Sequence, residues 1–164
     1  MKKLLYRLAT GAFLLAWMGI IFWFSAQPAT ESEEISGSVS YRVVETCNRI
    51  FDKNMTEATI SSWAKRIDYP IRKIAHMTEY AILAVLTGVC ILGYRNLGKK
   101  TYLSALFFSA GYAVTDEIHQ LYVAGRAGRF SDVCIDTVGA AMGLLLFGIV
   151  LKLAKSIAKS RRFH

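Results

Sequence analysis

The chain has 164 residues, 54% of them hydrophobic, and a mean hydropathy of +0.34, whereas a soluble domain usually has about 45–50% apolar residues. The excess is concentrated in long apolar stretches, which excludes an ordinary soluble domain and predicts a membrane protein. The formal net charge of +8 would suit a nucleic-acid-binding protein, but the distribution of the cations argues against that function. The three cysteines form no metal-binding pattern.

The first predicted element is a membrane-spanning helix over residues 4–24, which follows a pair of lysines. This beginning resembles a secretory signal peptide, but the apolar run is longer than the usual ~7–15 residues of a signal core. The run ends in the aromatic residues 22–24, and aromatic side chains are enriched where a helix leaves the membrane. We therefore interpret the helix as an uncleaved anchor.

Residues 25–70 are polar and form a predicted external segment. Two weakly amphipathic helices, over 39–51 and 57–67, suit the plane of the membrane interface. Pro70 then stands where a new helix is expected to begin. We hypothesise that this segment caps a pocket from the outside.

Three further stretches, 71–94, 101–123 and 133–154, each exceed the roughly 20 apolar residues that cross a bilayer. The prediction is a single all-α domain over residues 1–164, a bundle of four transmembrane helices with an external interfacial helical segment. Gly139 and Gly143 form a GxxxG motif in the last span, which permits close helix packing. We favour packing within the bundle, and the alternative is a homodimer.

The distribution of basic residues predicts the orientation. The N-terminus, the 95–100 loop and the C-terminus share one side and carry eleven cations and no acidic residue: Lys2, Lys3, Arg7, Arg95, Lys99, Lys100, Lys152, Lys155, Lys159, Arg161 and Arg162. Because short segments rich in lysine and arginine stay in the cytoplasm, both termini are predicted inside. The net charge is thus a topogenic signal with an affinity for anionic lipid head groups, not a nucleic-acid footprint.

Polar residues lie near the outer ends of three predicted spans, at spacings that place them on one helix face. They are Arg72, His76 and Glu79 on the second span, Tyr112, Asp116 and His119 with Glu117 and Gln120 beside them on the third, and Asp132 and Asp136 on the fourth. An ionisable residue in a membrane costs roughly 2.5–3.5 kcal/mol, so such groups pair with one another or face a cavity. Two interpretations follow: an ion-pair network that locks the bundle, or, as we prefer, a functional pocket open to the outside.

The residue types in these stripes suit anion chemistry. Histidines act as general acid or base near neutral pH, and arginines bind phosphate or carboxylate in bidentate fashion. The pair His76 and Glu79 would also suit a metal, but its spacing is generic. We predict a site without metal or other cofactor.

Three motifs in order resemble the VanZ-like family: Arg72 to Tyr80 (RKIAHMTEY), Thr115 to Gln120 (TDEIHQ) and Val123 to Val133 (VAGRAGRFSDV). Ala124 departs from the family pattern, which often has proline there. The resemblance implies a multi-spanning protein of the bacterial plasma membrane, and the name-giving member is associated with low-level resistance to teicoplanin-type glycopeptide antibiotics. Matched residue by residue, it points to Arg72, His76, Glu79, Asp116, Glu117, His119, Gln120, Arg126, Asp132 and Asp136.

The first functional hypothesis is a pocket that binds or processes an anionic lipid, such as a polyprenyl phosphate or diphosphate of cell-wall synthesis. As an enzyme it would be a metal-independent lipid phosphatase or phosphotransferase, in which His76 or His119 moves a proton or attacks phosphorus while Glu79 and Asp116 orient them. Substrate binding is assigned to Arg72, Arg126 and Arg129, with Gln27, Glu117, Gln120 and Asp132, and Asp136 would position an arginine.

The second hypothesis is a non-enzymatic module that binds lipopeptide or glycopeptide antibiotics or shields their target. A transporter is a third, for which four spans without charge in the inner half of the membrane are poorly suited.

Overall fold

The computed structural model describes residues 1–160, and every regular element within that range is a helix. The helices are α1 (Lys2–Ser25), α2 (Ala29–Ile50), α3 (Glu57–Leu92), α4 (Lys99–Gln120) and α5 (Phe130–Ser160). The all-α prediction is therefore confirmed. Two of the predicted inside cations, Arg161 and Arg162, lie outside the described residues.

Within the described residues, three helices are long and apolar enough to cross a membrane: α1, α3 and the Phe130–Lys159 part of α5. This supports a membrane protein. The predicted span over 101–123 is not confirmed by hydropathy, because α4 combines lysines in its first turn with Asp116 and Glu117 near its end.

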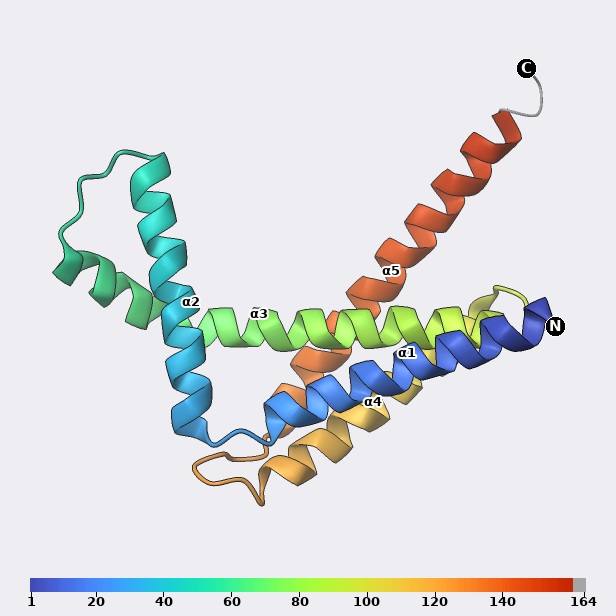
Figure 1. Cartoon of the computed structure of the whole chain (residues 1–164), viewed down its shortest axis with the longest axis horizontal. Coiled ribbons are helices and arrows are strands. Elements are labelled where there is room, and N and C mark those ends of the chain that lie inside the picture. The colour runs from blue at the N-terminus through green and yellow to red at the C-terminus, as the bar shows by residue number, and fades with distance from the viewer. Residues whose placement is uncertain (161–164) are drawn as a thin grey trace.

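The helices are arranged around α3. Figure 1 shows α1 and α4 running beside α3 for much of their length, while α5 crosses it obliquely. The buried core joins Ile21 of α1, Tyr80 and Leu83 of α3, Ala113 of α4 and Ala140 of α5, each fully buried. Side chains from all four helices thus fix how the polar stripes face one another.

The close crossing of α3 and α5 depends on the two glycines of the GxxxG motif. A Cβ atom on Gly143 would lie 2.5 Å from the carbonyl oxygen of Ala81, and one on Gly139 would overlap the carbonyl of Met77. Glycine is therefore required where the two backbones meet, as in other close helix pairs of membrane proteins. The predicted role of the motif in packing within the bundle is confirmed.

Pro70 does not begin a helix, which corrects the predicted boundary between an external helix over 57–67 and a span over 71–94. Instead, α3 continues through Pro70 for 36 residues. Proline removes one backbone hydrogen bond and bends a helix without necessarily ending it. Figure 1 shows α3 changing direction where α2 crosses it, and contacts with α2 support this bend. Ser40 of α2 donates a hydrogen bond to Asp68 over 3.2 Å.

Helix α2 is longer than predicted, because it begins at Ala29 directly after Pro28 rather than near residue 39. Pro28 ends the preceding turn, and the acidic Glu31 lies in the first turn, where it opposes the positive end of the helix dipole. Farther along, Val44 packs on Ile60 and Ala64 of α3 in a second small core. The α2–α3 hairpin is therefore a packed unit and not a loose linker.

The bundle has two chemically different ends (Figure 1). At one, which we call the basic end, Arg7 Nε of α1 donates to the carbonyl of Gly93 over 2.8 Å, after the end of α3. At the other, the α2 end, the amide of Ala29 donates to the carbonyl of Ala124 over 3.1 Å, joining the start of α2 to the α4–α5 loop. The polar stripes lie toward the α2 end.

Candidate functional site

A cavity of about 250 Å³ lies at the α2 end, between α2, α3 and the α4–α5 loop. We call it the charged cavity, because its wall carries four cations and two carboxylates: Arg72, Lys73, Arg126 and Arg129 against Glu33 and Asp132. His76 and Gln120 also line it. The excess of two positive charges makes the cavity attractive to an anion.

Two of the four cations are held by carboxylates. Lys73 Nζ lies 2.6 Å from Asp132 Oδ2, which links α3 to the first turn of α5. Arg72 bridges Glu33 of α2 at 3.5 Å and Asp68, one turn earlier in α3, at 3.2 Å. These ion pairs form part of the cavity wall, and the net positive charge of the cavity comes from the other two arginines.

Arg126 and Arg129 form no ion pair with a carboxylate within residues 1–160. The guanidinium of Arg126 donates instead to the backbone carbonyls of Gln27 at 3.1 Å and Phe24 at 3.4 Å. Burial, with the charge of Arg72 next, lowers the pKa of Arg126, although arginine stays charged near neutral pH. Arg126 is half-buried and Arg129 is exposed, and a cation that lacks a carboxylate partner is suited to an anionic ligand.

The loop that carries these arginines is tightly folded. Gly125 has a φ of +74°, a conformation that side-chain-bearing residues rarely adopt, and a Cβ there would lie 3.0 Å from the Cβ of Ala29. Glu117 Oε2 accepts a 2.7 Å hydrogen bond from the backbone N–H of Arg129. Glu117 of α4 therefore holds the α4–α5 loop in position.

A second cavity of about 220 Å³, the side cavity, lies between the end of α1, α2 and α3. Its wall is partly apolar and includes Phe24, Ile35, Val39, Ile71 and Ala75. It shares Arg72, His76 and Arg126 with the charged cavity, so the two cavities adjoin. Its other polar residues are Gln27, Ser32, Ser36 and Glu79.

His76 stands at the junction of the two cavities and faces Asp136 of α5. Its Nδ1 atom lies 3.9 Å from Asp136 Oδ1, slightly beyond hydrogen-bonding distance. The side chain of Asp136 is 1% exposed, and neither carboxylate oxygen has a hydrogen-bond partner among the described residues. The structure thus pairs Asp136 with His76 and not with an arginine, which differs from the sequence-based assignment.

Asp116 lies deeper, between α1 and α4. Its Oδ2 accepts hydrogen bonds from Ser25 at 2.8 Å and from Gln120 at 3.3 Å, while Oδ1 is buried without a partner. No histidine donates a hydrogen bond to it within residues 1–160, so the geometry shows Asp116 joining helices and not orienting His76 or His119.

A family model described as VanZ/LLP1 matches residues 10–151. The chain belongs to the VanZ/LLP1 family. The matched range contains every residue of both cavities, and the resemblance drawn from the three motifs is confirmed. No curated protein and no solved structure matches the chain.

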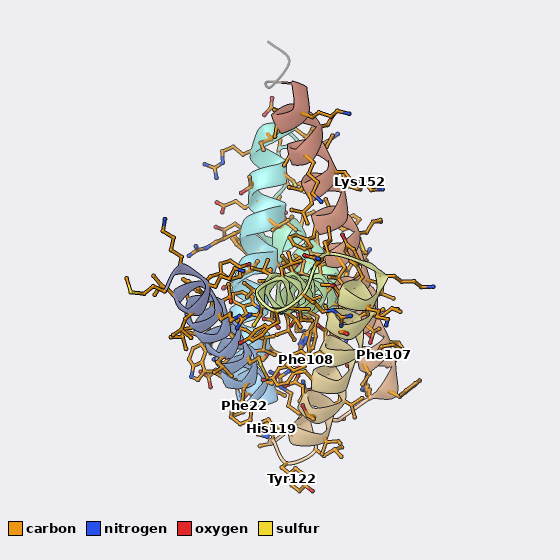
Figure 2. All side chains as sticks on the ribbon, turned by 90° about the vertical axis from the view of Figure 1, so that its right-hand side faces the viewer. Phe22, Phe107, Phe108, His119, Tyr122 and Lys152 are labelled. Carbon is orange, nitrogen blue, oxygen red and sulfur yellow. The ribbon has the colours of Figure 1, made fainter. Side chains whose placement is uncertain are left out.

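One of the predicted site residues lies apart in this VanZ/LLP1 protein. The ring of His119 stacks on Phe22 of α1 with centroids 4.4 Å apart, and Figure 2 shows the two side chains next to each other. His119 lines neither the charged nor the side cavity. Its Nε2 is buried without a partner among the described residues. Of the two predicted catalytic histidines, only His76 reaches the cavities.

The other predicted residues fall into three groups. Arg72, His76, Gln120, Arg126, Arg129 and Asp132 line the charged cavity, Gln27 and Glu79 join the side cavity, and Asp116, Glu117 and Asp136 are buried behind them. Helical spacing therefore located eight of these eleven residues, whereas Arg126 and Arg129 of the α4–α5 loop and Gln27 after α1 were predicted on other grounds.

Sequence reasoning missed three residues of the site. Lys73, which is absent from the predicted site residues, pairs with Asp132 in the cavity wall. Ser25 donates to the buried Asp116. Tyr80 is fully buried, with a hydroxyl that lacks a partner among the described residues. Tyr80 follows Lys73 by seven residues and His76 by four, so the same spacing argument would have included it.

The VanZ/LLP1 site contains no group of three or more His, Cys, Asp or Glu side chains placed to hold a metal ion, within the part of the chain that is described. Cys47, Cys90 and Cys134 are free thiols.

Proposed function

We propose that this protein binds an anionic lipid, such as a polyprenyl phosphate or diphosphate of cell-wall synthesis, by placing its phosphate head in the charged cavity. The observation that carries the proposal is the pair Arg126 and Arg129, which line a cavity of net positive charge without a carboxylate partner in the described chain. Guanidinium groups bind phosphate oxygens through pairs of parallel hydrogen bonds.

The adjoining side cavity supports a lipid and not a water-soluble phosphate. Because it shares Arg126 and His76 with the charged cavity, a head bound there is next to an apolar wall of Phe24, Ile35 and Val39. A hydrocarbon chain can lie against such a wall without leaving apolar surroundings, whereas a water-soluble phosphate gains nothing from it. The chain would leave between α1, α2 and α3.

The proposal includes a membrane placement with four spans. Helix α4 has 22 residues, about 33 Å of helix, and runs beside α1 and α3. Its lysines lie at the basic end, and its Asp116 and Glu117 are buried by neighbouring helices, which lowers their cost in a bilayer. With the basic end in the cytoplasm of a bacterial cell, both cavities face outward and α2 lies at the outer interface.

A second candidate function, hydrolysis of a lipid diphosphate, is favoured by the His76–Asp136 pair. With Nδ1 directed toward Asp136, the other ring nitrogen of His76 faces away from it and is available to a substrate. His76 would then act as general acid or base or attack phosphorus, while Arg126 and Arg129 stabilise the negative charge that develops.

The alternative is a module without catalysis that binds a teicoplanin-type antibiotic and gives low-level resistance. An apolar wall beside mixed charges, here Glu33 and Asp132 among the arginines, also suits a lipid-tailed antibiotic. Such a module needs no titratable group, so His76→Gln would leave resistance intact, whereas an enzyme would lose its activity.

Binding of phosphorylated polyprenol to the full chain in lipid nanodiscs tests the main proposal, with unphosphorylated polyprenol alongside. We expect Arg126→Gln and Arg129→Gln each to lower the affinity for the phosphorylated lipid by about tenfold, or about 1.4 kcal/mol. The matched control is Arg42→Gln, an exposed arginine on α2 outside both cavities. Equal affinity for the two lipids, or equal loss in the control, would contradict the proposal.

Phosphate release from undecaprenyl diphosphate tests the second candidate. We expect the unaltered protein to release phosphate and His76→Gln to release none. Binding of teicoplanin with no phosphate release from any lipid would favour the alternative.

A further inference from the structure

A second cavity suited to anions lies at the basic end, far from the proposed lipid site. It has a volume of about 460 Å³ and lies between the start of α1 and the turn from α3 to α4. Four cations line this basic cavity, Lys2, Lys3, Arg7 and Arg95, and no acidic residue does. We propose that it binds the phosphate of an anionic phospholipid head group in the inner leaflet.

Within residues 1–160, no carboxylate lines the basic cavity to compensate its charge. Helix α1 begins with two lysines, and neither α1 nor α4 has an acidic residue in its first turn. Because the N-terminus of a helix carries a partial positive charge, cations placed there are unfavourable and an anion is favourable. A phosphate at this place would offset both the lysines and the helix dipole.

Arg7, one of the two arginines of the basic cavity, is already positioned. Arg7 Nε donates to the carbonyl of Gly93 over 2.8 Å, and its guanidinium carbon lies 4.4 Å from the ring centroid of Tyr94. Gly93 permits this approach, because a Cβ there would lie 3.1 Å from Arg7 Cγ. Arg7 is thus fixed through one nitrogen and one face, and its terminal nitrogens form no hydrogen bond or ion pair within residues 1–160.

The surroundings favour a lipid over a soluble phosphate. Leu4, Leu5 and Leu8, in the same turns of α1 as the cations, are 60%, 69% and 63% exposed. Acyl chains of a lipid bound in the basic cavity would lie along this apolar surface. Basic pockets between transmembrane helices on the cytoplasmic side are a known mode of binding anionic head groups.

The basic cavity shares no residue with the charged or side cavity and lies at the opposite end of α3. This inference therefore does not rest on the proposed function. It does rest on the basic end facing the cytoplasm.

The test is native mass spectrometry of the full chain with added phosphatidylglycerol or, for comparison, phosphatidylcholine. We expect the protein to prefer phosphatidylglycerol, and expect the double change Arg7→Gln and Arg95→Gln to weaken its binding by about tenfold. The matched control changes Lys152→Gln and Lys155→Gln, which remove the same charge from exposed positions on α5 outside the cavity.

Further arms of the experiment keep the result decisive. The double change Lys2→Gln and Lys3→Gln leaves the packing of Arg7 intact and should also weaken the binding of phosphatidylglycerol. It serves as the test if the arginine variant fails to fold. Glycerol phosphate at the same concentration should not compete. Equal binding of the two lipids, equal losses in the α5 control, or full competition by glycerol phosphate would each overturn the proposal.

Discussion

The backbone of Gly139 in α5 lies directly on the backbone of Met77 in α3: a Cβ atom on Gly139 would lie 2.7 Å from Met77 Cα. His76 precedes Met77, and Asp136 lies three residues before Gly139. The contact that closes the bundle therefore also sets the 3.9 Å approach of His76 Nδ1 to Asp136 Oδ1. Packing and site geometry are coupled at this crossing.

Gly139→Ala should consequently destabilise the protein and separate His76 from Asp136. Overpacking of a close-packed interior costs about 1–3 kcal/mol, which we expect as a lower midpoint of thermal unfolding in detergent. Gly111→Ala is the matched control, because Gly111 also lies within a helix but has open space where a Cβ would go. A control as damaging as the Gly139 variant would show that the α3–α5 crossing is not the cause.

The ion pair between Lys73 and Asp132 should couple α3 to α5. Its side chains are 19% and 15% exposed, so water screens the pair only in part. In a double-mutant cycle of Lys73→Met and Asp132→Asn, we expect a coupling free energy of about 0.5–3 kcal/mol in unfolding. Purely additive effects of the two changes would mean that the 2.6 Å contact contributes nothing to the fold.

Ser25 should stabilise the protein by satisfying a buried carboxylate. Its hydroxyl donates to Asp116, which is 3% exposed and, among the described residues, has only Gln120 as a second donor. Ser25→Ala leaves the carboxylate with one donor, and we expect a loss of about 1–3 kcal/mol in unfolding free energy.

Ser38→Ala provides the comparison for that change. Ser38 is an exposed helical serine that bonds only to the carbonyl of Ile35 in its own turn, so its loss should cost little. Similar costs for the two variants would contradict a special role for Ser25.

Cysteine labelling checks the proposed orientation. In a chain with Cys90→Ser and Cys134→Ser, the exposed Cys47 of α2 should react with a membrane-impermeant maleimide on intact cells. A cysteine introduced by Gly98→Cys, in a chain that also carries Cys47→Ser, should react only after lysis, because Gly98 lies at the basic end with open space around it. The opposite labelling pattern would place both cavities in the cytoplasm.

The sequence predicts what depends on one helix alone, but not what depends on contacts between helices. Helical spacing placed Arg72 and His76 on one face, since that depends only on the turn of a helix. It could not exclude His119, because the stacking partner Phe22 comes from another helix, 97 positions away along the chain. Nor could spacing decide that α3 continues through Pro70, because contacts with α2 support the bend.

The partner of His76 was likewise a question of helix packing. Glu79 is on the same helix face as His76 and was expected to orient a histidine. The approach of Gly139 to Met77 instead brings Asp136 to His76. Sequence spacing predicts which residues share a helix face. The glycine contact decides which residues of different helices lie next to each other.

Asp136→Asn should separate function from stability. Both oxygens of this carboxyl group are buried without a hydrogen-bond partner among the described residues, so replacing it by an amide of the same shape removes no hydrogen bond. We expect the unfolding free energy to change by less than about 1 kcal/mol. Asp136 carries the carboxyl group that faces His76 Nδ1, so phosphate release, where it is measured, should fall as far as in His76→Gln, while binding of phosphorylated polyprenol through Arg126 persists. A variant that unfolds would show that Asp136 serves the fold, and one that keeps full phosphate release would remove it from the chemistry.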